Sequence, residues 1–325
     1  MKVAAGRTGV SDVKFAITAL CGFTLAAGAI EPALSKTSYV PFVIRQVSGK
    51  RPFVQAKLNG VPLLLMVHSN ADFFVMTTHA NAARAGLKKL KSVGHYGIVA
   101  HGKVSALGRA ETTLGSLRVG AVENKDVALS VFETPQKPVM QGMLGVQWLR
   151  ANHVIVDYAQ RRLGFAETDA DAAQLAEALR GRGYIALRMT WHPERRNYTV
   201  EGTAAGAADP VLVSTVSENI IGLPIAQRLN LPLADRGETA GGPAGSVQPS
   251  FTSSRAVPLC MDGHRWPVGG AVIYDQAIYA GKPGIPANVP ASITLGADFM
   301  LQNGAVIDYA SGTLYVRPSA AGGTC

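Results

Sequence analysis

Two aspartates in matching contexts are the first residues that could do chemistry together. Asp157 and Asp308 each end a run of apolar residues, and each is followed by Tyr-Ala. Carboxylates close enough to share one proton divide into an acid and a base, and such a pair can activate water. The two residues are therefore candidates for an acid–base pair.

Histidines and tryptophans are the other side chains whose chemistry has to be weighed. His95 and His101 could bind a metal, but no Cys or carboxylate near them completes a recognisable ligand set, which favours solvated hairpin positions. We expect no metal and no other cofactor. The tryptophans are more typical of core or surface anchors than of a base-stacking platform; they are Trp148, Trp191 and Trp266.

The two aspartates belong to a segment that the chain carries twice. Residues 144–165 read LGVQWLRANHVIVDYAQRRLGF, residues 295–316 read LGADFMLQNGAVIDYASGTLYV, and the two align without a gap. Self-similarity of this length indicates a duplicated structural unit. Only two copies are present, and they are far apart, which predicts two related lobes rather than a repeat array.

Composition indicates a mostly β protein. The 325 residues are 47% hydrophobic and 16% charged, which is enough to bury two cores of ordinary size. Glycine (35) and proline (18) are plentiful, whereas aromatic residues make up 7%. This mixture suits short strands joined by many turns better than a helical bundle.

The N-terminal segment has the features of an export signal. Basic residues precede an uncharged run at positions 15–29, which ends in Ala27-Gly28-Ala29. The run is short for a membrane span. We therefore expect residues 1–29 to be a signal peptide, and the mature protein to be periplasmic or secreted without a membrane anchor.

The charge and the cysteine content bear on nucleic-acid binding and on the redox state of the compartment. The formal charge is +9, and the basic residues are scattered rather than gathered with aromatic residues, so nucleic-acid binding is not expected. Cys260 and Cys325 would remain after removal of the signal. An oxidising compartment would permit a bond between them, but the sequence alone cannot place them in contact.

The pattern of strands and turns predicts where the lobes lie. In the first lobe, Asn59-Gly60 is a hairpin turn signal, residues 61–67 form an apolar strand, and residues 78–87 form a short helix. Further strands are expected around residues 96–104, 110–117 and 126–132. The lobe is assigned to residues 38–166.

The remaining chain is predicted to be a linker helix and a second lobe. Thr168 and Asp171 resemble a capping box, so residues 167–182 are assigned to an inter-lobe helix. Residues 183–318 form the second lobe, with strands at 198–201 and 210–213 and a helix at 223–231. Residues 238–254 are of low complexity and lack a phosphate-binding pattern, which favours a flexible hairpin tip.

Two apolar runs lead into short polar triplets at matching places in the two lobes. The run VPLLLMV precedes His68-Ser69-Asn70, and PVLV precedes Ser214-Thr215-Val216. A helix follows each triplet, and Leu-Gly turns come later. This order of parts resembles the aspartic proteases, in particular the retroviral-like (retropepsin-type) group. The resemblance implies two related β-barrel lobes with short helices and an inter-lobe cleft.

The resemblance departs from the family at the catalytic positions. By position, His68 and Ser214 stand where the family has its two aspartates, and neither can reproduce a carboxylate pair. Ser69 and Thr215 keep the hydroxyl that ties one loop to the other in the family. The third position, glycine in the family, is Asn70 and Val216, and a β-branched residue there predicts that the second loop has changed shape.

The resemblance also implies a structural role, not a catalytic one, for the paired aspartates. It places Asp157 and Asp308 on closing strands away from the catalytic loops, which favours a role at a turn or strand end. Water activation by the family mechanism is accordingly not expected.

Three functions remain open. The leading hypothesis is a pseudoprotease that binds an extended peptide or a protein partner in the cleft. The second is a hydrolase in which His68 activates Ser214 as a nucleophile; hydrogen-bond reach between the two side chains would favour it. Against it stands a neutral His68 that merely fills the place of an aspartate. The third is a structural envelope protein whose cleft is filled by its own side chains.

Overall fold

The computed structural model describes residues 37–47, 49–100, 103–134, 140–241, 247–279, 293–320 and 323–325. The expected signal peptide (1–29) and His101 lie outside these residues. No helix within them is long and apolar enough to cross a membrane.

Lobe 1 is built mainly of strands. Its elements are β1 (Ser38–Gln46), β2 (Lys50–Leu58), β3 (Val61–Val67), β4 (Val75–Thr77), α1 (His79–Arg84), β5 (Lys91–Gly94), β6 (Ile98–Ala100), β7 (Lys103–Val104), β8 (Arg109–Val119), β9 (Val122–Val131), β10 (Gly142–Leu144), α2 (Val146–Ala151), β11 (Val154–Asp157) and β12 (Arg162–Phe165).

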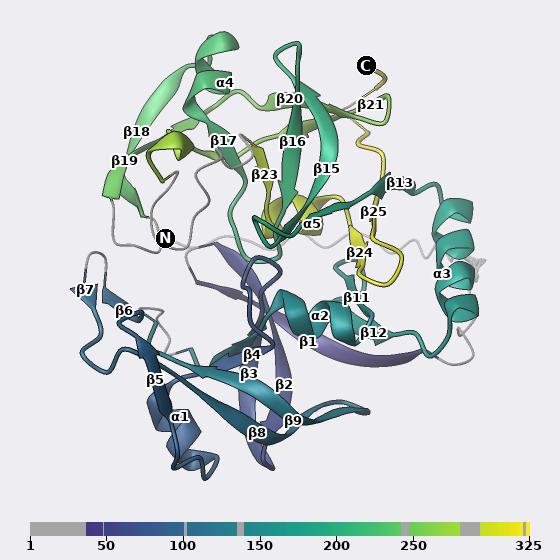
Figure 1. Cartoon of the computed structure of the whole chain (residues 1–325). Coiled ribbons are helices and arrows are strands. Elements are labelled where there is room, and N and C mark those ends of the chain that lie inside the picture. The colour runs from purple at the N-terminus through teal and green to yellow at the C-terminus, as the bar shows by residue number, and fades with distance from the viewer. Residues whose placement is uncertain are drawn as a thin grey trace, which may run out of the picture. The chain divides into compact units, whose positions relative to one another are not determined.

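Lobe 2 follows a linking helix, α3 (Asp169–Gly181). Its elements are β13 (Ile185–Arg188), β14 (Thr190–His192), β15 (Asn197–Ala204), β16 (Ala207–Val213), β17 (Ile220–Gly222), α4 (Leu223–Arg228), β18 (Leu233–Gly241), β19 (Val247–Ser253), β20 (Val257–Met261), β21 (His264–Val268), β22 (Val272–Tyr274), a 3-10 turn (Gln276–Tyr279), β23 (Ile293–Leu295), α5 (Ala297–Gln302), β24 (Val306–Asp308) and β25 (Thr313–Val316). The predicted fold class, mostly β with two related lobes, is confirmed (Figure 1).

The two lobes share one strand arrangement around their triplets. In lobe 1, β10 lies between β3, to which it is parallel, and β4, to which it is antiparallel. In lobe 2, β23 lies in the same way between β16 and β17. The chain segments that follow β3 and β16 therefore leave equivalent positions in the two lobes.

The repeated segments join the lobes in one continuous sheet. The order β13-β25-β24-β11-β12-β1 runs from lobe 2 into lobe 1. Where β11 meets β24, Val156 lies opposite Ile307, and these two residues are equivalent in the repeat. Tyr158 N–H donates to Ala305 O (2.9 Å) and Tyr309 N–H donates to Val154 O (3.1 Å). A local twofold axis therefore passes between β11 and β24.

Burial of the tryptophans separates core from periphery. Trp148 and Trp266 are fully buried, one in each lobe, as expected of core anchors. Trp191 is half-buried and packs at the edge of the core. Burying a large aromatic side chain stabilises the fold by about 1.5–3 kcal/mol, so one such residue is a substantial part of each core.

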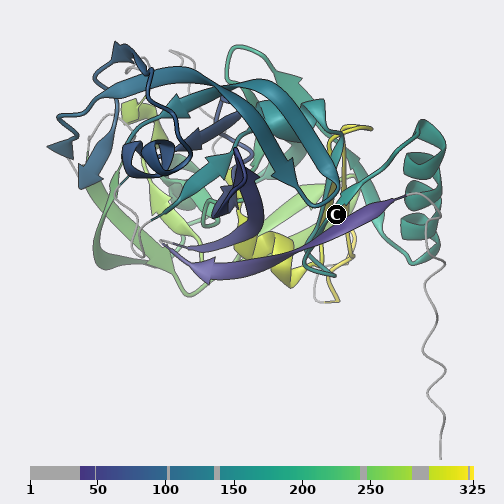
Figure 2. The same cartoon turned by 90° about the horizontal axis from the view of Figure 1, so that it is seen from below.

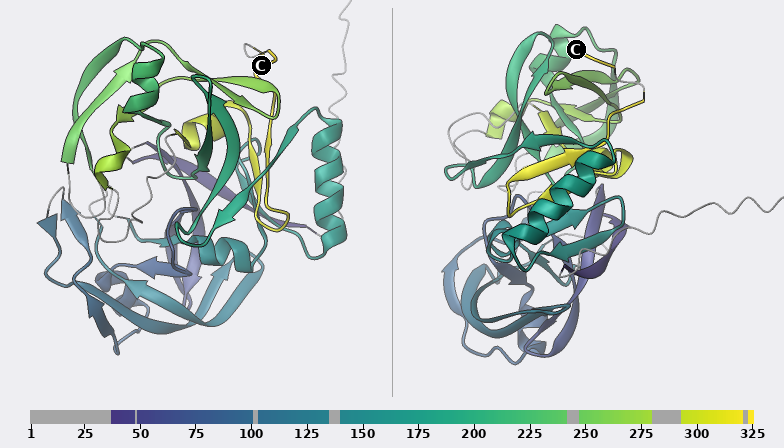
Figure 3. Two further views of the ribbon diagram at one scale, coloured as in Figure 1. Left: turned by 45° about the horizontal axis from the view of Figure 1, so that its top comes forward. Right: turned by 90° about the vertical axis from the view of Figure 1, so that its right-hand side faces the viewer.

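Helix α3 begins as the capping box predicts. Thr168 Oγ1 accepts a hydrogen bond from Asp171 N–H, and the Asp171 carboxylate accepts one from Thr168 N–H. The apolar face of the helix buries Leu175 and Leu179. In Figures 2 and 3 the helix stands at one side of the molecule, beside the junction of the lobes.

Two local predictions differ from the structure. The strand expected around residues 96–104 is instead the pair of short strands β6 and β7. The low-complexity segment 238–254 contributes mostly to the paired strands β18 and β19, and only residues 242–246 between them are undescribed. Backbone pairing therefore extends further than the composition suggested.

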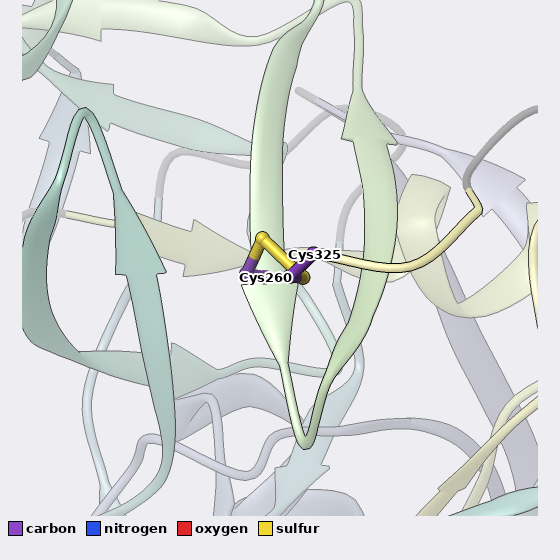
Figure 4. The surroundings of a disulfide bond; sticks show 2 residues. All are labelled: Cys260 and Cys325. Atoms are coloured by element: carbon purple, nitrogen blue, oxygen red, sulfur yellow. A yellow bond between two sulfur atoms is a disulfide. The ribbon is translucent and has the colours of Figure 1, made fainter.

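The two cysteines that the sequence could not pair are bonded to each other (Figure 4). Their Cα atoms are 6.0 Å apart. Arg265 N–H donates to Gly323 O (3.0 Å) and Cys325 N–H donates to Gly263 O (3.0 Å), so the segment before Cys325 runs along β21. The bond holds this segment against lobe 2.

Candidate functional site

Two short segments, which we call the loop pair, begin where β3 and β16 end. They are residues 68–70 and 214–216. His68 N–H donates to Leu144 O on β10, and Ser214 N–H donates to Leu295 O on β23, both at 2.9 Å. The Leu-Gly turns of the repeat therefore fix the start of each loop in the same way.

Reciprocal hydrogen bonds join the loop pair across the lobes. Ser69 N–H donates to Thr215 Oγ1 (2.9 Å) and Thr215 N–H donates to Ser69 Oγ (3.0 Å). Thr215 Oγ1 also donates to Val67 O (2.7 Å). Both hydroxyls are buried. They tie one loop to the other, and they place His68 and Ser214 on either side of this tie.

His68 is held as a neutral imidazole. Its Nδ1 accepts a hydrogen bond from Asn70 N–H (3.2 Å), so Nε2 carries the proton in the neutral ring. Loss of solvation on burial, with a smaller effect from the charge of Arg51, lowers the pKa of His68 to about 3. A ring with so low a pKa is a weak base at neutral pH.

The Ser214 hydroxyl is hydrogen-bonded within its own loop. Its hydroxyl is buried and accepts hydrogen bonds from Val216 N–H (3.4 Å) and Ser217 N–H (3.1 Å). Within the described residues no hydrogen bond joins the His68 ring to this hydroxyl. The geometry therefore does not show a His-activated serine.

The third positions of the triplets are compatible with ordinary backbone angles. Neither Asn70 nor Val216 has a positive φ. Val146 N–H donates to Ala71 O (2.9 Å), and Ala297 N–H donates to Ser217 O (3.0 Å), so both loops keep equivalent backbone bonds. The two loops of this chain therefore have the same backbone bonds at these places, and a change of the second loop relative to the family stays a prediction.

Val216 packs against lobe 1. It is 6% exposed and belongs to an apolar cluster rich in methionine, whose buried members are Val47, Phe53, Met66, Met76, Phe132, Met140, Met143 and Val216. We call this the methionine cluster. The Tyr96 ring, which is 42% exposed, meets Phe132 edge-on at 5.2 Å. A side chain from lobe 2 thus closes an apolar wall of lobe 1 beside the loop pair.

Two carboxylates near the loop pair were missed by sequence reasoning. Asp72 and Glu218 each lie four residues after the first residue of their loop. Asp72 pairs with Arg196 of lobe 2 (2.6 Å), and Glu218 pairs with Arg236 (3.3 Å). Their matching spacing from His68 and Ser214 was the available signal. Because each already faces an arginine, neither resembles a member of a proton-sharing pair.

Asp157 and Asp308 have the turn role that the resemblance favoured. Asp157 accepts from Gln160 N–H (2.9 Å) and pairs with Arg162 (3.2 Å). Asp308 accepts from Ala310 N–H (2.9 Å) and from Ser311 Oγ (2.6 Å). Each carboxylate satisfies the backbone of the turn that follows its strand. They are not a catalytic pair in this arrangement.

No site for a metal ion is present among the described side chains. No three His, Cys, Asp or Glu residues of this part of the chain lie close enough to hold a metal ion. His95 is exposed, as expected for a hairpin position.

Comparison with protein families finds a match within lobe 1. Residues 54–148, which include the first loop and the β10–α2 turn, match the aspartyl protease family model. The chain resembles the retropepsin-like aspartic proteases. No curated protein is detectably similar in sequence.

The solved structures that are similar to the chain include the following three. A retropepsin-like aspartic protease from Rickettsia conorii is 22% identical over 40% of this chain and 91% of its own, with a TM-score of 0.30. Basic 7S globulin from soybean is 13% identical over 87% of this chain and 95% of its own, with a TM-score of 0.46. An aspartic proteinase from Irpex lacteus is 10% identical over 87% of this chain and 98% of its own, with a TM-score of 0.48.

Proposed function

We propose that this chain is an exported pseudoprotease that binds an extended peptide or a protein partner where its two lobes meet. The observation that carries the proposal is the state of the loop pair. His68 and Ser214 stand at the two equivalent loop positions, and both are occupied by hydrogen bonds from their own loops. Neither offers the carboxylate that would activate water by the family mechanism.

Exposed strand edges of both lobes support binding of an extended chain. β5 ends the sheet of lobe 1 and all four of its residues are exposed, while β18 ends the sheet of lobe 2. From β18, Arg236 reaches Glu218, just beyond the second loop. Exposed strand edges bind extended peptides through main-chain hydrogen bonds and need no catalytic group.

Export is supported by the basic and apolar pattern of residues 1–29 and by the Cys260–Cys325 bond, which suits an oxidising compartment. The expected cleavage follows Ala29 and yields a soluble product. N-terminal sequencing of the protein from its own cells tests this. Intact Met1 in the membrane fraction would contradict it.

A cleavage assay tests the absence of catalysis. The purified mature protein should leave mixed peptide libraries uncut between acid and neutral pH. Cleavage that disappears in the double variant His68→Ala with Ser214→Ala would support the Ser-His hydrolase instead. Cleavage that survives in the double variant would show that the site lies elsewhere.

Site-directed cross-linking tests the bound partner. A photo-reactive residue at Tyr96, which contacts the methionine cluster through Phe132, should capture peptides of one chemical class in the cells that make the protein. The same group at Lys57, an exposed residue at the far end of β2, is the matched control. Equal capture at both places, or none at Tyr96, would argue against the proposal.

A structural envelope role is the second candidate, and the packing of Val216 favours it. Its side chain fills space beside the loop pair with atoms of the protein itself. If the protein is abundant and exported, and cross-linking at Tyr96 captures only other copies of this chain, this role replaces peptide binding.

A further inference from the structure

Two crevices are related by the local twofold axis. In each, the turn of one repeated segment faces the end of the helix in the other, so both lobes contribute to both crevices. The first has a volume of about 430 Å³ and the second about 590 Å³. Equivalent lining positions, first crevice before second, are Tyr158 and Tyr309, Arg161 and Gly312, Gln302 and Ala151, and Gly304 and His153.

The first crevice is cationic, and we call it the cationic crevice. Lys50 and Arg161 line it from lobe 1, and Arg317 and Gln302 line it from lobe 2. None of its lining residues is acidic. In the twin, the position of Arg161 is a glycine, and Arg150 lies over the Trp191 ring at 4.3 Å. The two crevices therefore differ in free positive charge.

Existing contacts orient these cations without neutralising all of them. Lys50 pairs with Asp298 (3.0 Å) at an exposed position. Arg317 Nε–H donates to the Tyr184 hydroxyl (2.8 Å), which fixes the guanidinium but leaves its charge. Arg161 has no side-chain hydrogen bond or ion pair within the described part of the chain. Of the three cations, only Lys50 is paired with a carboxylate of the described residues, and this carboxylate lies outside the lining of the crevice.

The turn position of Arg161 carries different residues in the two repeats. Its φ is +52°, a left-handed conformation that disfavours residues with a side chain. Gly312, its equivalent in the second repeat, has a φ of +64°. The chain therefore keeps a long cation where the same turn elsewhere uses glycine.

We propose that the cationic crevice binds a tetrahedral oxyanion, either inorganic phosphate or the phosphate group of a small organic ester. Guanidinium groups match the oxygen atoms of phosphate with paired hydrogen bonds, and an ammonium group adds charge. Gly304, beside Arg317, has no side chain to obstruct the approach. Because the cations come from both lobes, the anion bridges them. This site is independent of the proposed peptide function.

Calorimetric titration at constant ionic strength tests the site. Inorganic phosphate should bind the full mature protein saturably at one site, and glycerol phosphate in a second arm shows whether an ester is preferred. Arg161→Gly should weaken binding by roughly tenfold or more, the usual effect of removing a charge-assisted hydrogen bond. The same variant should melt at a higher temperature without phosphate, because it relieves the left-handed arginine.

Arg196→Gly is the matched control. Arg196 also has a left-handed backbone (φ +53°) and carries the same charge, but it lies outside the crevice. It should bind phosphate as the unaltered protein does. Arg317→Ala should weaken binding to a similar extent as Arg161→Gly. No saturable binding by the unaltered protein, or unchanged affinity in Arg161→Gly, would overturn the proposal.

Discussion

At the scale of single residues, the loop pair is specified by hydrogen bonds rather than by charge. His68 and Ser214 each accept from a backbone N–H of their own loop, and Ser69 and Thr215 exchange bonds between loops. The hydroxyl roles of Ser69 and Thr215 could be predicted from the triplets. The pairing of Asp72 with Arg196 could not, because it joins residues far apart in the sequence.

Replacing His68 should change how stability depends on pH. Its pKa is about 3 in the folded protein and near 6.5 in the unfolded chain, so between these values the unfolded state binds the extra proton. Stability contributed by the neutral ring is complete above pH 6.5 and is lost as the pH falls toward 3, by up to about 1.4 kcal/mol per pH unit.

The variant His68→Gln keeps a hydrogen-bond acceptor but does not titrate. Its free energy of unfolding should therefore fall less steeply than that of the unaltered protein between pH 6.5 and 3. Urea denaturation at a series of pH values measures this, with the exposed His95→Gln as control. Identical slopes for all three proteins would show that His68 titrates normally.

Removing the Thr215 hydroxyl should destabilise the protein strongly. Thr215→Val leaves the buried Ser69 N–H and Val67 carbonyl without their partner, at about 1–3 kcal/mol for each group. Thr215→Ser keeps the hydroxyl and is the control, costing only a buried methyl group. Equal stability of the two variants in denaturant titration would mean that the tie contributes nothing.

At the scale of elements, the repeated segment was the most predictable part and the second half of lobe 2 the least. The repeat predicted a duplicated unit, and the closing strands that carry Asp157 and Asp308 are found as β11 and β24. The short helices α2 and α5 within the repeat were not predicted. β18 and β19 were not predicted, because their segment is poor in strand-forming residues, yet they pair with each other. Tertiary pairing overrides weak local preference there.

The glycines that begin α2 and α5 should not accept a side chain. A Cβ at Gly296 would lie 2.2 Å from Ser217 O, and one at Gly145 would lie 2.0 Å from Phe73 O. Gly296→Ala should therefore cost at least about 1–3 kcal/mol, because backbone has to move. Gly181→Ala in α3 meets nothing within 4 Å and should stabilise by up to about 1 kcal/mol. Thermal unfolding of the two variants in opposite directions checks this, and a stable Gly296→Ala would contradict the close packing.

At the scale of the whole molecule, two places show a local twofold relation between the lobes. One lies between β11 and β24, and the other lies at the reciprocal bonds of the loop pair. The duplication could be predicted from the repeat. The identity of the residues that meet across it could not, because sequence similarity between the lobes is weak outside the repeated segment. The two triplets thus lie at equivalent places in the two lobes, and neither contains a carboxylate.

The proposed pseudoprotease should gain activity when both loops are given the family triplet. Replacing His68 and Ser214 with aspartate, Ser69 with threonine, and Asn70 and Val216 with glycine gives both loops the family triplet. Loss of the Val216 side chain from the methionine cluster should cost on the order of 2–4 kcal/mol, so the variant should melt earlier but still fold. Weak peptide cleavage favoured by acid is expected, since one carboxyl of the pair has to be protonated.

The single variants His68→Asp and Ser214→Asp are the controls for this experiment. Each supplies one carboxylate without a partner to share its proton, so each should remain inactive on the same peptides. Circular dichroism and melting separate loss of fold from loss of function. A folded full variant that cleaves nothing would show that the junction of the lobes is blocked beyond its loops. Cleavage by a single-aspartate variant would show that a second aspartate in the loop pair is not required.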